Sequence, residues 1–234
     1  TSGFDTSKVV NMSYIFYGCS NLENVDLSNF NTSNVINMEG VFLNDTNLKE
    51  IKLGDNFKTN KVTTMLAMFA SCSSLKRVDL SNFDTSNVTN MQSMFYKCEN
   101  LELLDLSSFK TNKVTNMYCM FAYCTSLKTI NLTSFDTSKV TTMQSMFLLC
   151  KSIEMLDLST FTTDSATNIM YMFDTCSSLK SLDIRNASFS SVSKNTSAFN
   201  VVNSNVVVYV KNDTEKEFII NTIKNIISDN VIAG

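Results

Sequence analysis

The stretch FDTSNVTNMQSMFYKCENLELLDLSS, from Phe83 to Ser108, recurs along the chain with small variations and decides its architecture. Successive copies open with a phenylalanine, at intervals of 26, 27, 26, 26, 26, 26 and 28 residues, at Phe4, Phe30, Phe57, Phe83, Phe109, Phe135, Phe161 and Phe189. Self-similarity at a fixed period of this length is typical of a solenoid, in which every repeat adds one coil. We number each unit from its phenylalanine, so that position 1 of the fourth unit is Phe83.

Each unit contains a helical spacing of apolar residues. Positions 9, 12, 13 and 16 follow the i, i+3, i+4, i+7 pattern of one helical face. In the quoted unit they are occupied by Met91, Met94, Phe95 and Cys98. A polar residue just before the first methionine, here Asn90, can cap a helix by accepting a backbone N–H. The pattern predicts about two turns of helix in every coil.

The second half of each unit contains a strand pattern. Leu101, Leu104 and Leu106 have the spacing L-x-x-L-x-L, and the last two alternate with polar residues as in a strand with one buried face. This spacing is also the strand signature of leucine-rich repeats. The pair Val88 and Thr89 indicates a second extended segment elsewhere in the coil.

The apolar positions of one unit cannot enclose a core by themselves. Eight of them recur in each unit, at positions 1, 6, 9, 12, 13, 19, 22 and 24, so every coil must cover its neighbours. We therefore predict an α/β repeat solenoid over residues 1–188. It should be a right-handed leucine-rich-repeat stack of about seven coils, each with a strand and a short helix.

Residues 189–234 have the features of a C-terminal cap. The run VVVYV lacks alternation, which predicts a strand at about 205–210 that is buried on both faces. Thr214 and Glu217 match a capping box, which predicts a helix at about 214–228. The isoleucines of this helix, Ile219, Ile220, Ile223, Ile226 and Ile227, would cover the last coil. No similar cap precedes Phe4, so we expect further coils or a partner to cover the N-terminal coil.

The composition excludes several classes of function. The 234 residues include no histidine, so a Ser-His-Asp or Cys-His centre and histidine metal ligands are absent. A formal net charge of −3 gives no global positive field, which makes nucleic acid a poor partner. No apolar run approaches the roughly 18 residues of a membrane-spanning helix. The cysteines lack the short spacing of zinc ligands, and we expect neither a metal nor a cofactor.

Equivalent positions of stacked coils form columns. Position 16 carries Cys19, Cys72, Cys98, Cys124, Cys150 and Cys176. Because their side chains should point in parallel, we predict a row of small buried thiols rather than disulfides. Asp45 takes this position in the second unit. A deeply buried unpaired carboxylate is unfavourable, which predicts that position 16 lies near the turn, at least in that coil.

The combination TSxVTxMxxMFxxCxSLxxLDLSxF resembles the BspA-like leucine-rich repeats of bacterial surface proteins, and the resemblance extends from Phe4 to about Ser188. It implies an exported protein, on the cell surface or attached to the cell wall, that acts in adhesion or in binding host proteins. It implies no catalytic residues. We expect any export signal or anchor to lie outside this chain.

The strand face is the candidate surface for a partner. Position 21 varies most between units, and its outward Leu103 and Met155 suit contact with a partner as apolar residues in a polar setting. Together with position 23, the candidate residues are Arg77, Asp79, Leu103, Asp105, Thr129, Met155, Asp157 and Ser181. We expect a non-enzymatic module that recognises a protein or glycan on a host or neighbouring cell surface.

Other functions remain open at this point. A structural spacer within a longer surface protein would have the same sequence features. A carbohydrate-active enzyme could use paired carboxylates such as Asp79 and Asp105, although repetition argues against a unique catalytic centre. The aspartate column could also bind calcium, since like charges on neighbouring strands need relief.

Overall fold

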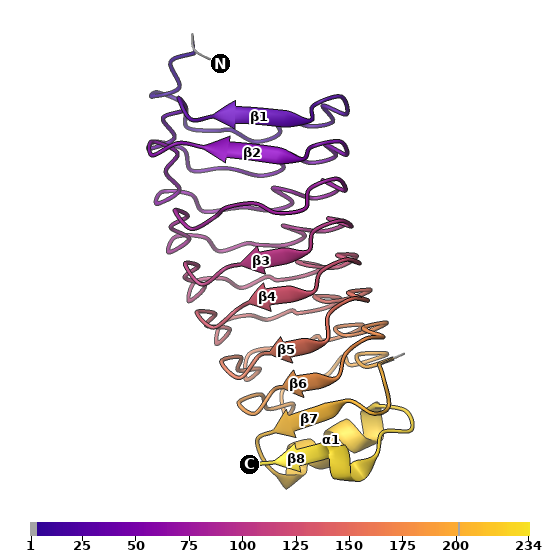
Figure 1. The fold of residues 1–234 in the computed structure, drawn as a ribbon. Helices are drawn as coiled ribbons and strands as arrows, with labels where there is room; N and C mark the ends of the chain where they lie inside the picture. Colours follow the sequence, from indigo (N-terminus) through magenta and orange to yellow (C-terminus); the bar gives the residue numbers. More distant parts are fainter. Residues whose placement is uncertain (1–3, 201) are drawn as a thin grey trace.

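Short parallel strands follow one another along one side of the molecule, and an α-helix lies at its C-terminal end (Figure 1). The computed structural model describes residues 4–200 and 202–234. In this part of the chain the elements are β1 (Asn24–Leu27), β2 (Glu50–Leu53), β3 (Leu103–Asp105), β4 (Thr129–Asn131), β5 (Met155–Asp157), β6 (Ser181–Asp183), β7 (Val207–Val210), α1 (Asp213–Thr222), a 3-10 turn (Ser228–Asn230) and β8 (Val231–Ala233). The chain winds through about eight coils in a right-handed sense, which confirms the predicted repeat solenoid.

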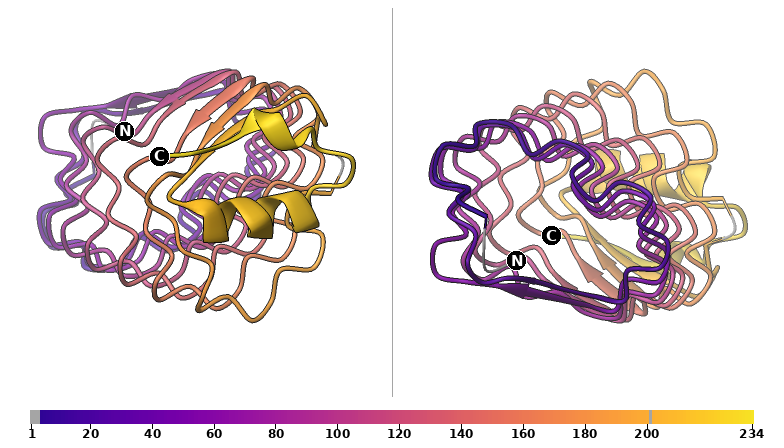
Figure 2. Two further views of the ribbon diagram at one scale, coloured as in Figure 1. Left: turned by 90° about the horizontal axis from the view of Figure 1, so that it is seen from below. Right: turned by 90° about the horizontal axis from the view of Figure 1, so that it is seen from above.

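The strands of neighbouring coils pair in parallel with an offset of one repeat. Leu104 of β3 lies beside Ile130 of β4, and Leu156 of β5 lies beside Leu182 of β6. The pairs form three separate sheets, β1-β2, β3-β4 and β5-β6-β7-β8. In β3 only the middle residue is buried, as the alternation of side chains across a strand requires. Views along the stack show the coils as an elongated ring with the strands on one long side (Figure 2).

The helix predicted in each coil is wrong, although its four apolar residues are buried as expected. Positions 11 and 15 have left-handed backbone, with φ of 55° at Ser93 and 57° at Lys97, and this divides the segment into successive turns. Ser93 N donates to Tyr118 O of the next coil at 2.8 Å. In a helix such N–H groups would bond within their own segment, and the facing carbonyl groups of the next coil would lack a donor.

A second row of parallel pairing runs through the coils at position 8. Isolated bridges join Asn11, Asn37, Thr64, Asn90, Asn116, Thr142, Asn168 and Lys194 in sequence. Thr89 N also donates to Thr63 O at 2.9 Å, so the extended segment predicted around Val88 and Thr89 belongs to this row. Asn90 does not cap a helix. Its Oδ1 accepts from Gln92 N at 2.9 Å and closes a tight turn instead.

Phenylalanine and cysteine side chains fill the interior in columns. Phe95 and Phe121 stack with their ring centroids 5.8 Å apart, and neither side chain is exposed. The position-16 cysteines are free thiols, as predicted, and all except the exposed Cys19 are buried. The buried thiols donate to a phenylalanine carbonyl of the preceding coil, as Cys98 Sγ does to Phe69 O at 3.1 Å. Each column therefore joins adjacent coils by both packing and hydrogen bonds.

Asp45 lies next to a turn, as predicted, and is nevertheless fully buried in the cysteine column. Its exposed fraction is 0%. Oδ1 accepts from Cys19 N at 2.7 Å, whereas Oδ2 has no hydrogen-bond partner within the described ranges. Burial raises the pKa of Asp45 from 3.8 to about 6. The stacking register places this column inside the stack in the coils after the first, even where aspartate occupies it.

Threonine at position 3 bridges adjacent coils from inside. Thr111 Oγ1 donates to Asp136 O at 2.8 Å and accepts from Asp136 N at 2.8 Å. The position-3 threonines of seven coils are buried, namely Thr6, Thr32, Thr59, Thr85, Thr111, Thr137 and Thr163. Their regular recurrence is therefore explained by pairing with the next coil.

Replacing Thr111 with valine is expected to lower the free energy of unfolding by about 1–2 kcal/mol, because valine has nearly the same shape but leaves the N–H and C=O of Asp136 without a partner. Urea unfolding followed by circular dichroism measures this loss. The control is Thr115→Val, because Thr115 is exposed and makes one long hydrogen bond of 3.4 Å. A loss of similar size in both variants would contradict the bridging role.

The C-terminal helix begins and ends before the predicted residues. Asn212 caps α1, since its Oδ1 accepts from Glu215 N at 3.1 Å, so the predicted capping box of Thr214 and Glu217 is wrong. The buried Glu215 fixes this start, because its Oε2 also accepts from Phe189 N at 3.1 Å. The helix lies across the end of the stack (Figure 2).

The chain beyond α1 returns to the sheet, which the sequence did not predict. Asn225 has a φ of 61°, and the following chain forms β8, in which Val231 pairs with Val208 of β7. The predicted strand near 205–210 is confirmed as β7, but it alternates between buried and half-buried residues and is not buried on both faces. Ile219 and Ile223 are buried, whereas Ile227 is 49% exposed.

Phe189 does not open a further coil. Ala187 takes position 1, because its N donates to Ile184 O at 2.9 Å as the phenylalanines of the preceding coils do to the equivalent carbonyl. Phe189 therefore falls at position 3, where the other coils have threonine, and its ring stacks on Phe218 of α1 with 4.3 Å between centroids. The domain division after residue 188 stays a prediction.

Candidate binding face

The eight candidate residues lie together on the strand side of the stack, a surface formed by positions 20, 21 and 23 that we call the strand face. Position 21 carries Arg77, Leu103, Thr129, Met155 and Ser181, and position 23 carries Asp79, Asp105 and Asp157. Strand pairing brings neighbours into register, so that Leu103 lies beside Thr129 and Met155 beside Ser181. Leu103 is 54% exposed and Met155 72%. Their part in binding stays a prediction.

The aspartates found at position 23 each close the turn that follows them. Asp79 Oδ1 accepts from Ser81 N at 3.0 Å, and Asp105 Oδ1 accepts from Ser107 N at 3.0 Å. Hydrogen bonds from the hydroxyl and backbone N–H of Ser81 hold the pKa of Asp79 below its usual value. The backbone N–H and hydroxyl of Ser107 lower the pKa of Asp105 in the same way. Both carboxyl groups are therefore ionised at neutral pH.

Charges at position 20 pair between neighbouring coils. Three ion pairs form, Lys49 with Glu23 at 2.9 Å, Lys128 with Glu102 at 3.1 Å and Lys180 with Glu154 at 2.8 Å. Lys76 is the remaining residue of this column, and neither it nor the adjacent Arg77 forms an ion pair in the described part of the chain. Exposed pairs add little stability, at most about 1 kcal/mol each, so their main effect is on the surface charge.

The strand face is interrupted at the third coil. Residues 77–80, between β2 and β3, do not form a strand. Within residues 4–200 and 202–234, Arg77, Val78 and Asp79 make no hydrogen bond from backbone to backbone. The interruption follows the one unit with a spacing of 27 residues. In its longer loop a Cβ on Gly54 would lie 2.1 Å from Ser28 O, so only glycine fits this close approach.

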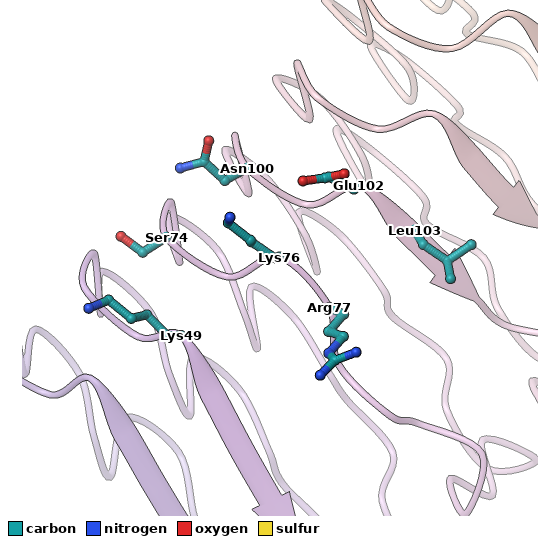
Figure 3. A pocket seen from close by; sticks show the side chains of 7 residues that line it. All are labelled: Lys49, Ser74, Lys76, Arg77, Asn100, Glu102 and Leu103. Carbon is teal, nitrogen blue, oxygen red and sulfur yellow. The ribbon is translucent and has the colours of Figure 1, made fainter.

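A hollow of about 670 Å³ opens beside the interrupted segment, and we call it the coil-3 hollow (Figure 3). It is lined by Lys49, Ser74, Lys76, Arg77, Asn100, Glu102 and Leu103. Figure 3 shows that these side chains come from three consecutive coils, with Arg77 and Leu103 one step further along the strand direction than Lys76 and Glu102. An adjoining hollow of about 600 Å³ shares Lys49, Arg77 and Leu103 and extends to Asp105.

A further hollow lies at the junction of β4 and β5. Its volume is about 550 Å³, and it is lined by Lys128, Thr129, Ser152, Glu154, Met155 and Ser178. Lys128 and Glu154 each have an ion-pair partner in a neighbouring coil. The two most exposed apolar residues of the strand face, Leu103 and Met155, therefore each stand beside a hollow. Of these two hollows, the coil-3 hollow is the one lined by cations that form no ion pair within the described residues.

The sequence analysis did not identify the hollow or the contributions of Lys76, Ser74 and Asn100 to it. The available signal was the spacing of 27 residues and the glycine within it, at Gly54. A change of repeat length displaces the chain relative to its neighbours, and pairing can fail there.

The described residues contain no group of three or more cysteine, aspartate or glutamate side chains placed to hold a metal ion. The buried thiols are also poor ligands, because burial raises the pKa of Cys124 to about 12 and keeps it protonated. Among the same residues, no helix has the length and apolar character that crossing a membrane requires.

Comparisons with known proteins identify a repeat family. A solved structure of a leucine-rich repeat protein from Bacteroides ovatus aligns with 87% of this chain and 67% of its own, with 16% sequence identity and a TM-score of 0.30. No curated protein matches the sequence. A family model described as "Mycoplasma protein of unknown function, DUF285" matches residues 1–102, 47–130 and 100–209. Because these overlapping matches extend over most of the chain, the protein belongs to the DUF285 family.

Proposed function

We propose that this protein is a non-enzymatic recognition module of the BspA-like type, located on the outside of a bacterial cell. Its strand face would contact a protein or glycan on a host or neighbouring cell. The observation that carries the proposal is the exposure of Leu103 and Met155, 54% and 72%, beside hollows in an otherwise polar surface. Burying such residues against a partner removes apolar area from water, and methionine and arginine are enriched at interfaces.

The carboxylates of the strand face fit recognition better than glycoside hydrolysis. A glycosidase needs one carboxylic acid that stays protonated and donates to the leaving oxygen. Asp79 and Asp105, the pair suggested by the sequence, both have a lowered pKa because they accept hydrogen bonds in turns. Both also recur by register, which gives no unique centre.

The experiment uses the folded chain against a panel of purified host extracellular proteins and glycans, with affinities measured by surface plasmon resonance. For any ligand that binds saturably, the double variant Leu103→Asp and Met155→Asp is expected to bind about tenfold or more weakly, because each new carboxylate would lose water without gaining a partner. Panel members that bind the variant and the wild type equally would contradict the proposal, and so would a panel without saturable binding, which would favour a spacer.

The matched control makes the same chemical change away from the strand face. Ile36 and Ile227 are 46% and 49% exposed, and neither lies on positions 20, 21 or 23. The double variant Ile36→Asp and Ile227→Asp should therefore bind within about twofold of wild type, since isolated surface substitutions have small effects.

A further inference from the structure

We propose that the coil-3 hollow binds an acidic polypeptide segment, with one carboxylate held by Lys76, another by Arg77, and an apolar side chain placed against Leu103. This inference rests on the proposed function and assigns a chemistry to one part of the strand face.

The first argument is charge. Three cations and one anion line the hollow, and the other charges there are already paired: Lys49 with Glu23 and Glu102 with Lys128. Lys76 and Arg77 thus present positive charge without an ion-pair partner among the described residues. A carboxylate accepts hydrogen bonds from both lysine and arginine, and the arginine fork can hold it by two bonds.

The second argument concerns the neutral lining. The side chains of Ser74 and Asn100 make no hydrogen bond in the described ranges, so a hydroxyl and an amide are available beside the cations. Peptide groups offer both donors and acceptors to such side chains. Leu103, which is 54% exposed, offers an apolar contact. An extended acidic peptide that also carries apolar residues satisfies all three features.

The lining of the hollow also fits a polypeptide better than an anionic glycan. Among the described residues, no aromatic side chain lines the coil-3 hollow or the adjoining hollow, so a sugar ring has no aromatic face there on which to stack. The apolar contact is a single leucine, which fits an aliphatic side chain of a peptide better than a hydroxylated ring. An anionic glycan would use the cations but would leave Leu103 without a matching group.

The experiment measures fluorescence anisotropy of a labelled peptide of alternating aspartate and leucine with the whole chain, at low and high salt. Saturable binding that weakens with salt is expected, and Lys76→Glu with Arg77→Glu should reduce affinity about tenfold or more. Lys110→Glu with Lys139→Glu makes the same change in net charge at exposed residues outside the strand face, and should stay within about twofold of wild type. Circular dichroism checks that both variants are folded.

Three results would overturn the inference. One is equal peptide binding by both double variants, and another is no saturable binding to the wild type. The third is tighter binding of an oligogalacturonate than of the peptide, with the same dependence on Lys76 and Arg77. The proposed function is tested separately. Suppose that a panel ligand no longer binds the variant with Leu103→Asp and Met155→Asp but still binds the variant with Lys76→Glu and Arg77→Glu. This result would support the recognition module and contradict only the acidic-peptide site.

Discussion

Replacing Phe109 with alanine is expected to lower the free energy of unfolding by about 3–5 kcal/mol, the usual cost of deleting a buried aromatic ring. Phe109 has an exposed fraction of 0% and stacks between Phe83 and Phe135, with 6.4 Å between ring centroids on both sides. Its loss removes apolar contacts with two neighbouring coils at once. Because each coil is held only by its neighbours, the stack has no other core to compensate.

The same substitution at Phe4 provides the control. Phe4 occupies the same column position in the first coil, but it is 75% exposed, so Phe4→Ala should change the stability by less than about 0.5 kcal/mol. Urea unfolding of both variants and of the wild type, followed by circular dichroism, gives the comparison. A loss below about 1 kcal/mol at Phe109 would mean that the column is not closely packed.

The stack could be predicted from the sequence because its determinants recur. Each apolar position of the repeat is filled by apolar residues in several coils, so its burial is indicated several times over. Leu104 and Leu156, for example, are both buried as the strand pattern requires. The backbone between these positions could not be predicted in the same way. A spacing of i, i+3, i+4, i+7 also fits a pair of turns with left-handed residues at Ser93 and Lys97, because apolar spacing reports which side chains are buried and not which hydrogen bonds form.

The candidate site was only partly predictable for a related reason. The outward positions of Leu103 and Met155 follow from alternation within a strand. The coil-3 hollow arises where the pattern fails, after the longer unit that contains Gly54, and a repeat frame describes the average coil rather than its exceptions. The cations of this hollow stand out only once the ion pairs are known. The other lysines of position 20 each pair with a glutamate of a neighbouring coil, whereas Lys76 does not pair within the described residues.

Replacing Asp45 with cysteine is expected to stabilise the protein, and the gain should depend on pH. The folded-state pKa of Asp45 is raised from 3.8 to about 6, so the folded protein holds this proton more tightly than the unfolded chain. The contribution of this group to stability is complete below about pH 3.8 and is lost as the pH rises through about 6. The free energy of unfolding of the wild type therefore falls by about 3 kcal/mol between low pH and pH 7.5. About 0.5 kcal/mol of this fall has occurred by pH 4.

Cysteine removes this penalty because a buried thiol stays neutral over the whole range and restores the column found in the other coils. Cys19 N keeps a partner, since it also donates to Phe16 O at 3.1 Å. Urea unfolding at pH 4 and pH 7.5, under reducing conditions, should give a gain of about 0.5 kcal/mol at the lower pH and about 3 kcal/mol at the higher one. Other carboxyl groups are common to both proteins and cancel in the difference. Asp45→Asn keeps the shape and should follow the same pH dependence, whereas a gain that is equal at both pH values would mean that Asp45 is not buried as a carboxylate.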